Sequence, residues 1–167
     1  MRITAIPNFN YSVNNRYSAQ KINFKADSCK KGSFFTQVDD YLYRGGTPNA
    51  VRDLQELKDA GISVIVNVAD EILYDTEDAE KMGMQFHYLP MGMNPKDEML
   101  KEFFEITDEV RSNNKKMYVH CIYGKDRSGL ATNLYKLRYN LPVDTSDLNT
   151  SFAKMIYDEY LENTKNF

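Results

Sequence analysis

The residue pair best suited to covalent chemistry in this chain is a cysteine followed six positions later by an arginine. The pair lies in the segment His120-Cys121-Ile122-Tyr123-Gly124-Lys125-Asp126-Arg127-Ser128-Gly129. A cysteine thiolate is a strong nucleophile. The planar guanidinium of arginine can bind two phosphate oxygens at once, and its permanent charge stabilises the transition state. The spacing of Cys121 and Arg127 therefore predicts nucleophilic attack on a phosphate ester.

The flanking sequence predicts that this segment is a loop between a strand and a helix. Residues 116–120 form a run typical of a short buried strand, and residues 128–140 carry apolar side chains at helical spacing. Backbone N–H groups in such a loop can point inward, and the N-terminus of the following helix adds partial positive charge. Phosphate would fit there, and because the same field favours a thiolate, we expect Cys121 to react as an anion.

The other residues of the loop have expected supporting roles. Ser128 is close enough in sequence to hydrogen-bond the sulfur as it leaves, and His120 stands where its ring can fix the loop. Gly124 and Gly129 permit a close approach of backbone. The alternative interpretation is a buried structural cysteine beside a surface arginine. The residues expected to bind the phosphate are Ile122, Tyr123, Gly124, Lys125, Asp126 and Arg127.

Length and charge are consistent with one small enzyme domain. With 167 residues the chain lies in the usual single-domain range, and its net charge of -3 argues against nucleic acid as a general partner. Residues 1–32 nevertheless hold six Lys or Arg and one acid. We therefore expect a flexible basic arm over residues 1–32 and a single catalytic domain over residues 33–167. The arm is either a plain solvated tail or a contact for a partner or an anionic lipid surface.

The cysteine and histidine content bears on compartment, metal and cofactor. A catalytic thiolate requires a reducing compartment, and no stretch is apolar enough to cross a membrane or to form a secretory signal, so we expect a cytoplasmic protein. Two histidines, His87 and His120, are too few for a zinc site, and we expect neither metal nor cofactor. Cys29 is expected to be an incidental exposed thiol, and the alternative is a regulatory disulfide with Cys121.

Strands are expected to alternate with helices from residue 33 onward. The patterns predict a hairpin of residues 34–38 and 41–44, a turn at Gly45 and Gly46, and a helix that Thr47 caps and Gly61 ends. This order predicts an α/β fold with a central, mainly parallel sheet flanked by helices. The cysteine loop would then lie at the carboxyl end of a strand, where ligands bind such sheets. The remaining expected elements are strands over 62–68, 85–89 and 116–120, and helices over 76–82, 96–113, 128–140 and 146–161.

The cysteine loop resembles the signature of the protein tyrosine phosphatase superfamily, in which His-Cys is followed by five residues, Arg, and Ser or Thr. Tyr43-Arg44-Gly45-Gly46-Thr47-Pro48 and the later run of residues 61–68 are similar to the amino-terminal half of atypical dual-specificity phosphatases. The resemblance covers about residues 34–163 and implies the cysteine-based phosphatase fold. It also implies a phosphomonoesterase that forms a thiophosphate intermediate and acts on phosphotyrosine, phosphoserine, phosphoinositides or inositol phosphates.

Lys125 and Arg44 each have two possible roles under this resemblance. The Gly124-Lys125-Asp126-Arg127 variant is similar to phosphatases that act on phosphoinositides or inositol phosphates as well as on proteins. There Lys125 would add a second cation and favour a polyanionic substrate, unless it simply faces water. Arg44 is a fixed element in such relatives, and it would serve either as a pocket cation or as a hydrogen-bond anchor of the hairpin.

The general acid has two candidates. The reaction needs a carboxylic acid to protonate the leaving oxygen and then, as a carboxylate, to activate water. Relatives place an aspartate on a loop before the cysteine, where this chain has Asp97; otherwise Asp97 would be a first-turn helix residue stabilised by the helix dipole. Relatives with the same Lys-Asp-Arg sequence have been assigned an acid at the position of Asp126, which would otherwise orient Arg127 through a salt bridge. The third alternative is that no dedicated acid exists.

Two other functions fit part of the pattern. The first is an inactive phosphatase fold that binds phosphorylated partners, although such proteins have usually lost the nucleophile and Cys121 is present. The second is a rhodanese-type sulfurtransferase, which also uses a cysteine in a loop after a strand. The sulfurtransferase does not predict the whole pattern from Cys121 to Ser128.

Overall fold

The computed structural model describes residues 35–48, 50–71, 76–91 and 95–144, together with residues 158, 159 and 162. The predicted basic arm over residues 1–32, Cys29 within it, and most of the predicted helix over residues 146–161 lie outside the described residues. None of the helices in the described ranges has the length and hydropathy needed to span a membrane.

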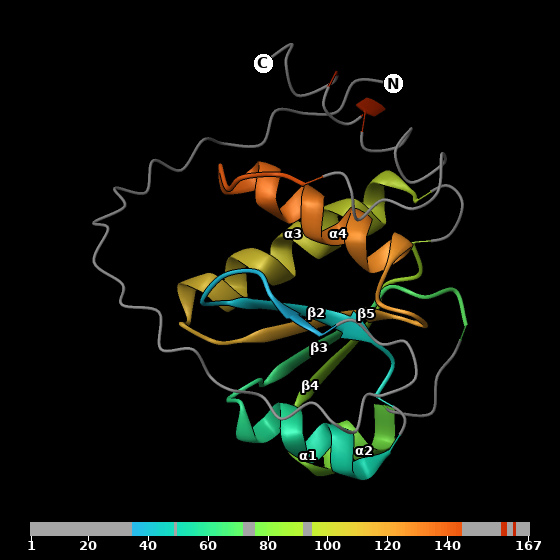
Figure 1. The fold of residues 1–167 in the computed structure, drawn as a ribbon, viewed down its shortest axis with the longest axis vertical. Helices are drawn as coiled ribbons and strands as arrows, with labels where there is room; N and C mark the ends of the chain where they lie inside the picture. The colour runs from blue at the N-terminus through green and yellow to red at the C-terminus, as the bar shows by residue number, and fades with distance from the viewer. Residues whose placement is uncertain are drawn as a thin grey trace.

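A five-stranded sheet forms the centre of the molecule, in the order β1-β2-β5-β3-β4 (Figure 1). β1 pairs with β2 in the antiparallel sense, and all other neighbours are parallel, as predicted. The strands are β1 (Thr36–Gln37), β2 (Leu42–Gly46), β3 (Val64–Asn67), β4 (Gln85–Tyr88) and β5 (Met117–Cys121).

Helices cover both faces of the sheet, as the sequence predicts. α1 (Val51–Asp59) and α2 (Thr76–Lys81) lie on one face, and α3 (Asp97–Ser112) and α4 (Asp126–Arg138) lie on the other (Figure 1). α4 begins two residues earlier than predicted, because the backbone N–H of Gly129 already donates to the carbonyl of Lys125 at 2.7 Å. The first turn of α4 is therefore built from the segment that the sequence predicts to bind phosphate.

One local prediction is wrong: Gly45 and Gly46 do not form a turn. Both glycines remain in β2, where Gly45 pairs with His120 and Gly46 with Cys121. β2 therefore runs beside β5 as far as the cysteine itself. The isolated hairpin pattern does not reveal this pairing, since the partner strand lies more than seventy residues later in the chain.

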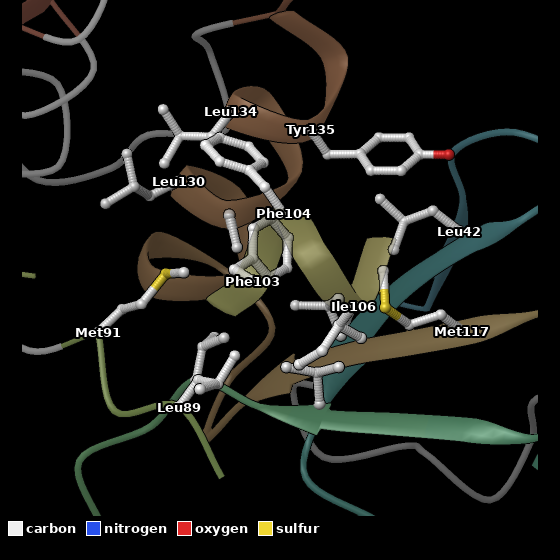
Figure 2. Packing of buried hydrophobic residues seen from close by; sticks show 14 of the residues in the cluster. Leu42, Leu89, Met91, Phe103, Phe104, Ile106, Met117, Leu130, Leu134 and Tyr135 are labelled. Atoms are coloured by element: carbon white, nitrogen blue, oxygen red, sulfur yellow. The ribbon is translucent and has the colours of Figure 1, made fainter. Parts of the chain in front are cut away.

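Two apolar cores lie between the sheet and its helices. The larger core packs sheet residues such as Leu42 and Met117 against Phe103 of α3 and Leu134 of α4 (Figure 2). The smaller core joins the opposite face of the sheet to α1 and α2. Side chains alternate along β5, so that Met117, Val119 and Cys121 belong to the larger core and Tyr118 to the smaller one. This alternation directs the Cys121 side chain to the side of the sheet that α4 covers.

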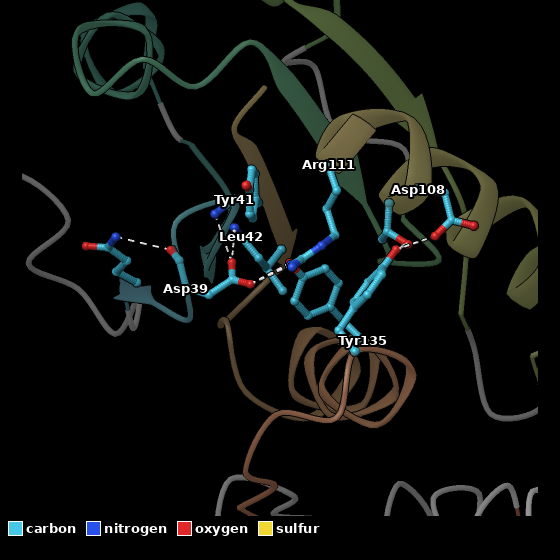
Figure 3. A network of polar contacts seen from close by, with 9 residues as sticks. Asp39, Tyr41, Leu42, Asp108, Arg111 and Tyr135 are labelled. Carbon is cyan, nitrogen blue, oxygen red and sulfur yellow. Dashed lines mark hydrogen bonds and ion pairs between the residues drawn. The ribbon is translucent and has the colours of Figure 1, made fainter. Parts of the chain in front are cut away.

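A polar network joins the turn between β1 and β2 to α3 and α4 (Figure 3). The Asp39 carboxylate accepts hydrogen bonds from the Arg111 guanidinium at 2.8 Å and from the Tyr135 hydroxyl at 2.7 Å. It also accepts the backbone N–H groups of Tyr41 and Leu42, at 2.9 and 2.8 Å. Burial and the neighbouring Asp39 raise the pKa of Tyr135, so its hydroxyl remains a proton donor at any physiological pH. The network thus attaches the turn between β1 and β2 to α3 and to α4, the helix that follows the cysteine loop.

The substitution Tyr135→Phe tests this network. It removes the hydroxyl that donates to Asp39 and leaves the carboxylate with an unfilled acceptor position in a partly buried site. We expect the free energy of unfolding to fall by about 1–3 kcal/mol, measured by urea denaturation. The matched control is Tyr88→Phe, whose hydroxyl bonds a carbonyl at the exposed surface. Equal losses in the two variants would contradict a stabilising role for the network.

Candidate active site

Cys121 is the last residue of β5, and the loop of residues 122–125 connects it to α4. The thiol is buried, since the residue is 3% exposed. The Ser128 hydroxyl lies 3.4 Å from the Cys121 sulfur and is itself fully buried. The hydroxyl is therefore placed where it can donate to a sulfur anion. The loop also lies at the N-terminus of a thirteen-residue helix, whose free N–H groups favour an anion.

Thr47, which follows β2, holds the start of the loop by two hydrogen bonds, and a third hydrogen bond joins β5 to β2. Thr47 donates its backbone N–H to the carbonyl of Ile122 at 3.3 Å and its hydroxyl to the carbonyl of Cys121 at 3.2 Å. The Tyr118 hydroxyl donates to the carbonyl of Gly46 at 2.6 Å. The prediction that Thr47 caps α1 is wrong, because the N-cap is Ala50 and the Thr47 side chain instead donates to the backbone carbonyl of Cys121.

Gly124 packs directly on the backbone of β2. Its φ of +72° lies in the left-handed region, and a Cβ added there would stand 2.5 Å from the carbonyl carbon of Gly45 and 2.6 Å from the nitrogen of Gly46. Such distances are far inside van der Waals contact, so a larger side chain would force the loop away from the strand. The three glycines therefore set how closely the cysteine loop approaches the sheet.

Arg127 lies in the first turn of α4, with its side chain 25% exposed. Its Nη1 atom donates to Glu71 at 2.7 Å and lies 3.5 Å from an Asp70 carboxylate oxygen. Burial lowers the pKa of Arg127, but the hydrogen bond and charge of Glu71 and the nearby Cys121 raise it overall. The hydrogen bond from Arg127 in turn lowers the pKa of Glu71. The guanidinium therefore stays charged close to the thiol.

Sequence reasoning missed Asp70 and Glu71. They follow directly after β3, which is the neighbour of β5 in the sheet. Ligand-contacting residues often follow the carboxyl ends of neighbouring parallel strands. Acidic residues after the strand next to the cysteine strand could therefore have been proposed as site residues, but only if the strand order had been known.

The remaining predicted loop residues differ in exposure. Ile122 packs against the larger core, Tyr123 is 64% exposed, and Lys125 is half-buried at the N-cap of α4. Gly129 is buried in the first turn of α4. Lys125 thus lies at the junction of the loop and the helix.

His120 and Arg44 are buried beside the loop. The His120 ring is fully buried and stacks on Tyr118, with ring centroids 5.8 Å apart. Arg44 lies in β2 opposite Val119 and is also buried. Because side chains alternate along β2, Arg44 is on the same side of the sheet as Leu42 and the cysteine.

The two candidate acids occupy different surroundings. Asp97 is the first residue of α3 and is exposed. Asp126 is the first residue of α4, and its Oδ1 atom is buried and makes no hydrogen bond to the described residues. The predicted salt bridge between Asp126 and Arg127 is wrong, because the described ion-pair partners of Arg127 are Glu71 and Asp70.

The described ranges hold no group of three or more His, Cys, Asp or Glu residues arranged for a metal ion.

Gly124→Ala and Gly83→Ala form a matched pair that tests the contact with β2. Both glycines have positive φ, +72° and +76°, but a Cβ at Gly83 would meet no atom within 4 Å. Gly83→Ala therefore measures the backbone strain alone, about 1–2 kcal/mol. We expect Gly124→Ala to lose more stability and to weaken binding of inorganic phosphate by roughly tenfold or more, as misplaced binding groups do. Calorimetric titration and urea denaturation measure both effects; equal stability losses with unchanged phosphate affinity would refute the contact.

Comparison with known proteins adds independent information. The family model for the dual specificity phosphatase catalytic domain matches residues 42–153, which is more than half of the chain. No curated protein sequence matches the chain. The matched range includes β2, β3, β5 and the whole cysteine loop.

Solved structures share the fold. Tk-PTP in a mutant form with one glycine replaced by alanine has a TM-score of 0.66 at 24% sequence identity, and the match covers 80% of this chain and 97% of that one. A candidate phosphatase (DUF442) from Shewanella putrefaciens CN-32 has a TM-score of 0.61 at 25% identity, with 77% and 85% covered. Kinase associated phosphatase with its catalytic-site cysteine replaced by serine has a TM-score of 0.63 at 19% identity, with 72% and 85% covered.

The family match over both halves of the site agrees with the fold shared with these phosphatases. The chain therefore belongs to the dual specificity phosphatase family, as a cysteine-based phosphatase catalytic domain.

Proposed function

We propose that the chain hydrolyses phosphate monoesters through a thiophosphate intermediate on Cys121. The observation that carries the proposal is the Cys121 sulfur, which lies 3.4 Å from the Ser128 hydroxyl at the N-terminal end of α4. Arg127 follows in the same helical turn and supplies a permanent positive charge. The proposed substrates are phosphotyrosine, phosphoserine, phosphoinositides or inositol phosphates, and no cofactor takes part.

The first half of the reaction transfers the phosphoryl group to the enzyme. The loop amides and Arg127 bind the non-bridging oxygens, and the Cys121 thiolate attacks phosphorus. The phosphorus–sulfur bond forms as the bond to the leaving oxygen breaks. A carboxylic acid, Asp97 or Asp126, gives its proton to that oxygen. The alcohol or phenol then departs.

The second half regenerates the thiolate. The same aspartate, now a carboxylate, takes a proton from a water molecule, whose oxygen attacks phosphorus. The phosphorus–sulfur bond breaks, and the Ser128 hydroxyl donates a hydrogen bond to the sulfur as negative charge returns to it. Inorganic phosphate leaves the loop. A thiolate chemistry of this kind requires a reducing compartment, and we propose that the protein works in the cytoplasm.

The structure supports an enzyme better than the alternative, an inactive fold that binds phosphorylated partners. A binding protein needs the anion-binding loop but needs neither a buried cysteine nor a hydroxyl placed against its sulfur. The role of the basic arm over residues 1–32 is a separate proposal: contact with a partner or an anionic surface.

Replacing the nucleophile tests the proposal. We expect Cys121→Ser to lower hydrolysis of an aryl phosphate by at least about 10⁴-fold, since a serine hydroxyl is a much weaker nucleophile than a cysteine sulfur. The assay measures phosphate release by reduced protein in the presence of a metal chelator. Cys29→Ser is the matched control and is expected to retain activity. Activity that survives in Cys121→Ser, or that falls equally in both variants, would exclude the cysteine mechanism.

The two candidate acids are distinguished by the leaving group. Asp97→Asn and Asp126→Asn are each assayed on an activated aryl phosphate and on an alkyl phosphate, whose poor leaving group needs a proton. The true acid is expected to lose about 10²–10⁴-fold on the alkyl phosphate and much less on the aryl phosphate. The buried and unpaired Oδ1 of Asp126 supports that residue. If neither variant shows the selective loss, both assignments fail.

A further inference from the structure

The acidic residues that contact Arg127 are held in place by their own hydrogen bonds. The buried Asn67 side chain accepts the backbone N–H of Ala69 at 2.8 Å, which shapes the turn after β3. The Tyr88 hydroxyl donates to the carbonyl of Asp70 at 2.6 Å and ties this turn to β4. The turn after β3 thus leads to Glu71, whose carboxylate accepts a hydrogen bond from the guanidinium.

The two acids lie on the solvent side of the arginine. The side chains of Asp70 and Glu71 are both 50% exposed, whereas that of Arg127 is 25% exposed. A phosphate bound by Arg127 would lie near both carboxylates, because each is within 3.5 Å of the guanidinium. Two negative charges within a few ångströms of a bound phosphate repel it, and they repel a second phosphate on the same molecule further.

We propose that Asp70 and Glu71 are specificity-determining residues that disfavour substrates carrying a second phosphate beside the reacting one. The inference rests on the proposed function, because it concerns the choice among phosphate monoesters at the Cys121 loop. It opposes the expectation that Lys125 selects a polyanion. Lys125 contributes one positive charge at the N-cap of α4, whereas Asp70 and Glu71 contribute two negative charges in direct contact with Arg127.

A different role for Glu71 makes the opposite prediction. If Glu71 served only to orient Arg127, its removal would free the guanidinium to rotate and would weaken binding of every phosphate compound. If Glu71 acts through its charge, its removal strengthens binding, and the gain grows with the negative charge of the ligand. The sign of the change therefore separates an orienting residue from a specificity-determining one.

The test measures binding in the Cys121→Ser background, where no turnover interferes. Inorganic phosphate and pyrophosphate are titrated calorimetrically into Cys121→Ser, and into the same protein carrying Glu71→Gln or Asp70→Asn. We expect Glu71→Gln to bind phosphate roughly threefold more tightly and pyrophosphate roughly tenfold more tightly. The ratio of the two affinities should shift in the same direction for Asp70→Asn. High salt should reduce the shift, because it screens half-exposed charges.

Glu80→Gln is the matched control. Glu80 is an exposed residue of α2, and its substitution changes the net charge of the protein by the same amount. The proposal is overturned if Glu71→Gln weakens both ligands, leaves the affinity ratio unchanged, or shifts it no more than Glu80→Gln does. A wild-type protein without phosphatase activity would refute the proposed function while leaving the binding ratio measurable, so the two failures are distinguishable.

Discussion

The contact between Gly124 and the Gly45–Gly46 backbone is the constraint on which the rest of the site depends. In the proposed mechanism, the loop has to lie close enough to the sheet for its amides and Arg127 to bind one phosphoryl group at the sulfur. A Cβ at Gly124 would come within 2.5 Å of the neighbouring strand, so the approach is possible only without side chains. Thr47 stabilises the same contact, because it donates hydrogen bonds to the carbonyls of Cys121 and Ile122.

The strand order explains why three distant segments meet at this point. β5 lies between β2 and β3, and all three run parallel, so their carboxyl ends share one edge of the sheet. β5 supplies Cys121, β2 supplies the glycines and Thr47, and β3 leads into Asp70 and Glu71. The helix α4 then brings Arg127 and Ser128 back over the cysteine. The proposed nucleophile, the residues that contact its loop and the acids that pair with Arg127 thus come from, or follow, three different strands.

Within the described residues, local patterns were enough to predict a mainly parallel sheet, helices on its faces and a loop after the cysteine strand, but not the order of the strands. They succeed because the loop residues lie within ten positions of one another and the strands are apolar runs. They failed for Gly45 and Gly46, where a pair of glycines was interpreted as a turn although its role is contact with Gly124. They also missed Glu71, because its contact with Arg127 spans fifty-six positions and depends on strand order.

The central claim is that Cys121 carries the phosphoryl group during turnover, and the most direct measurement is to trap it there. The reduced enzyme is mixed with an aryl phosphate, quenched in acid within the first turnovers, digested and analysed by mass spectrometry. The account predicts one added phosphoryl group on the peptide that contains Cys121, absent from Cys121→Ser. Turnover without that adduct, or with the phosphoryl group on another residue, would contradict it.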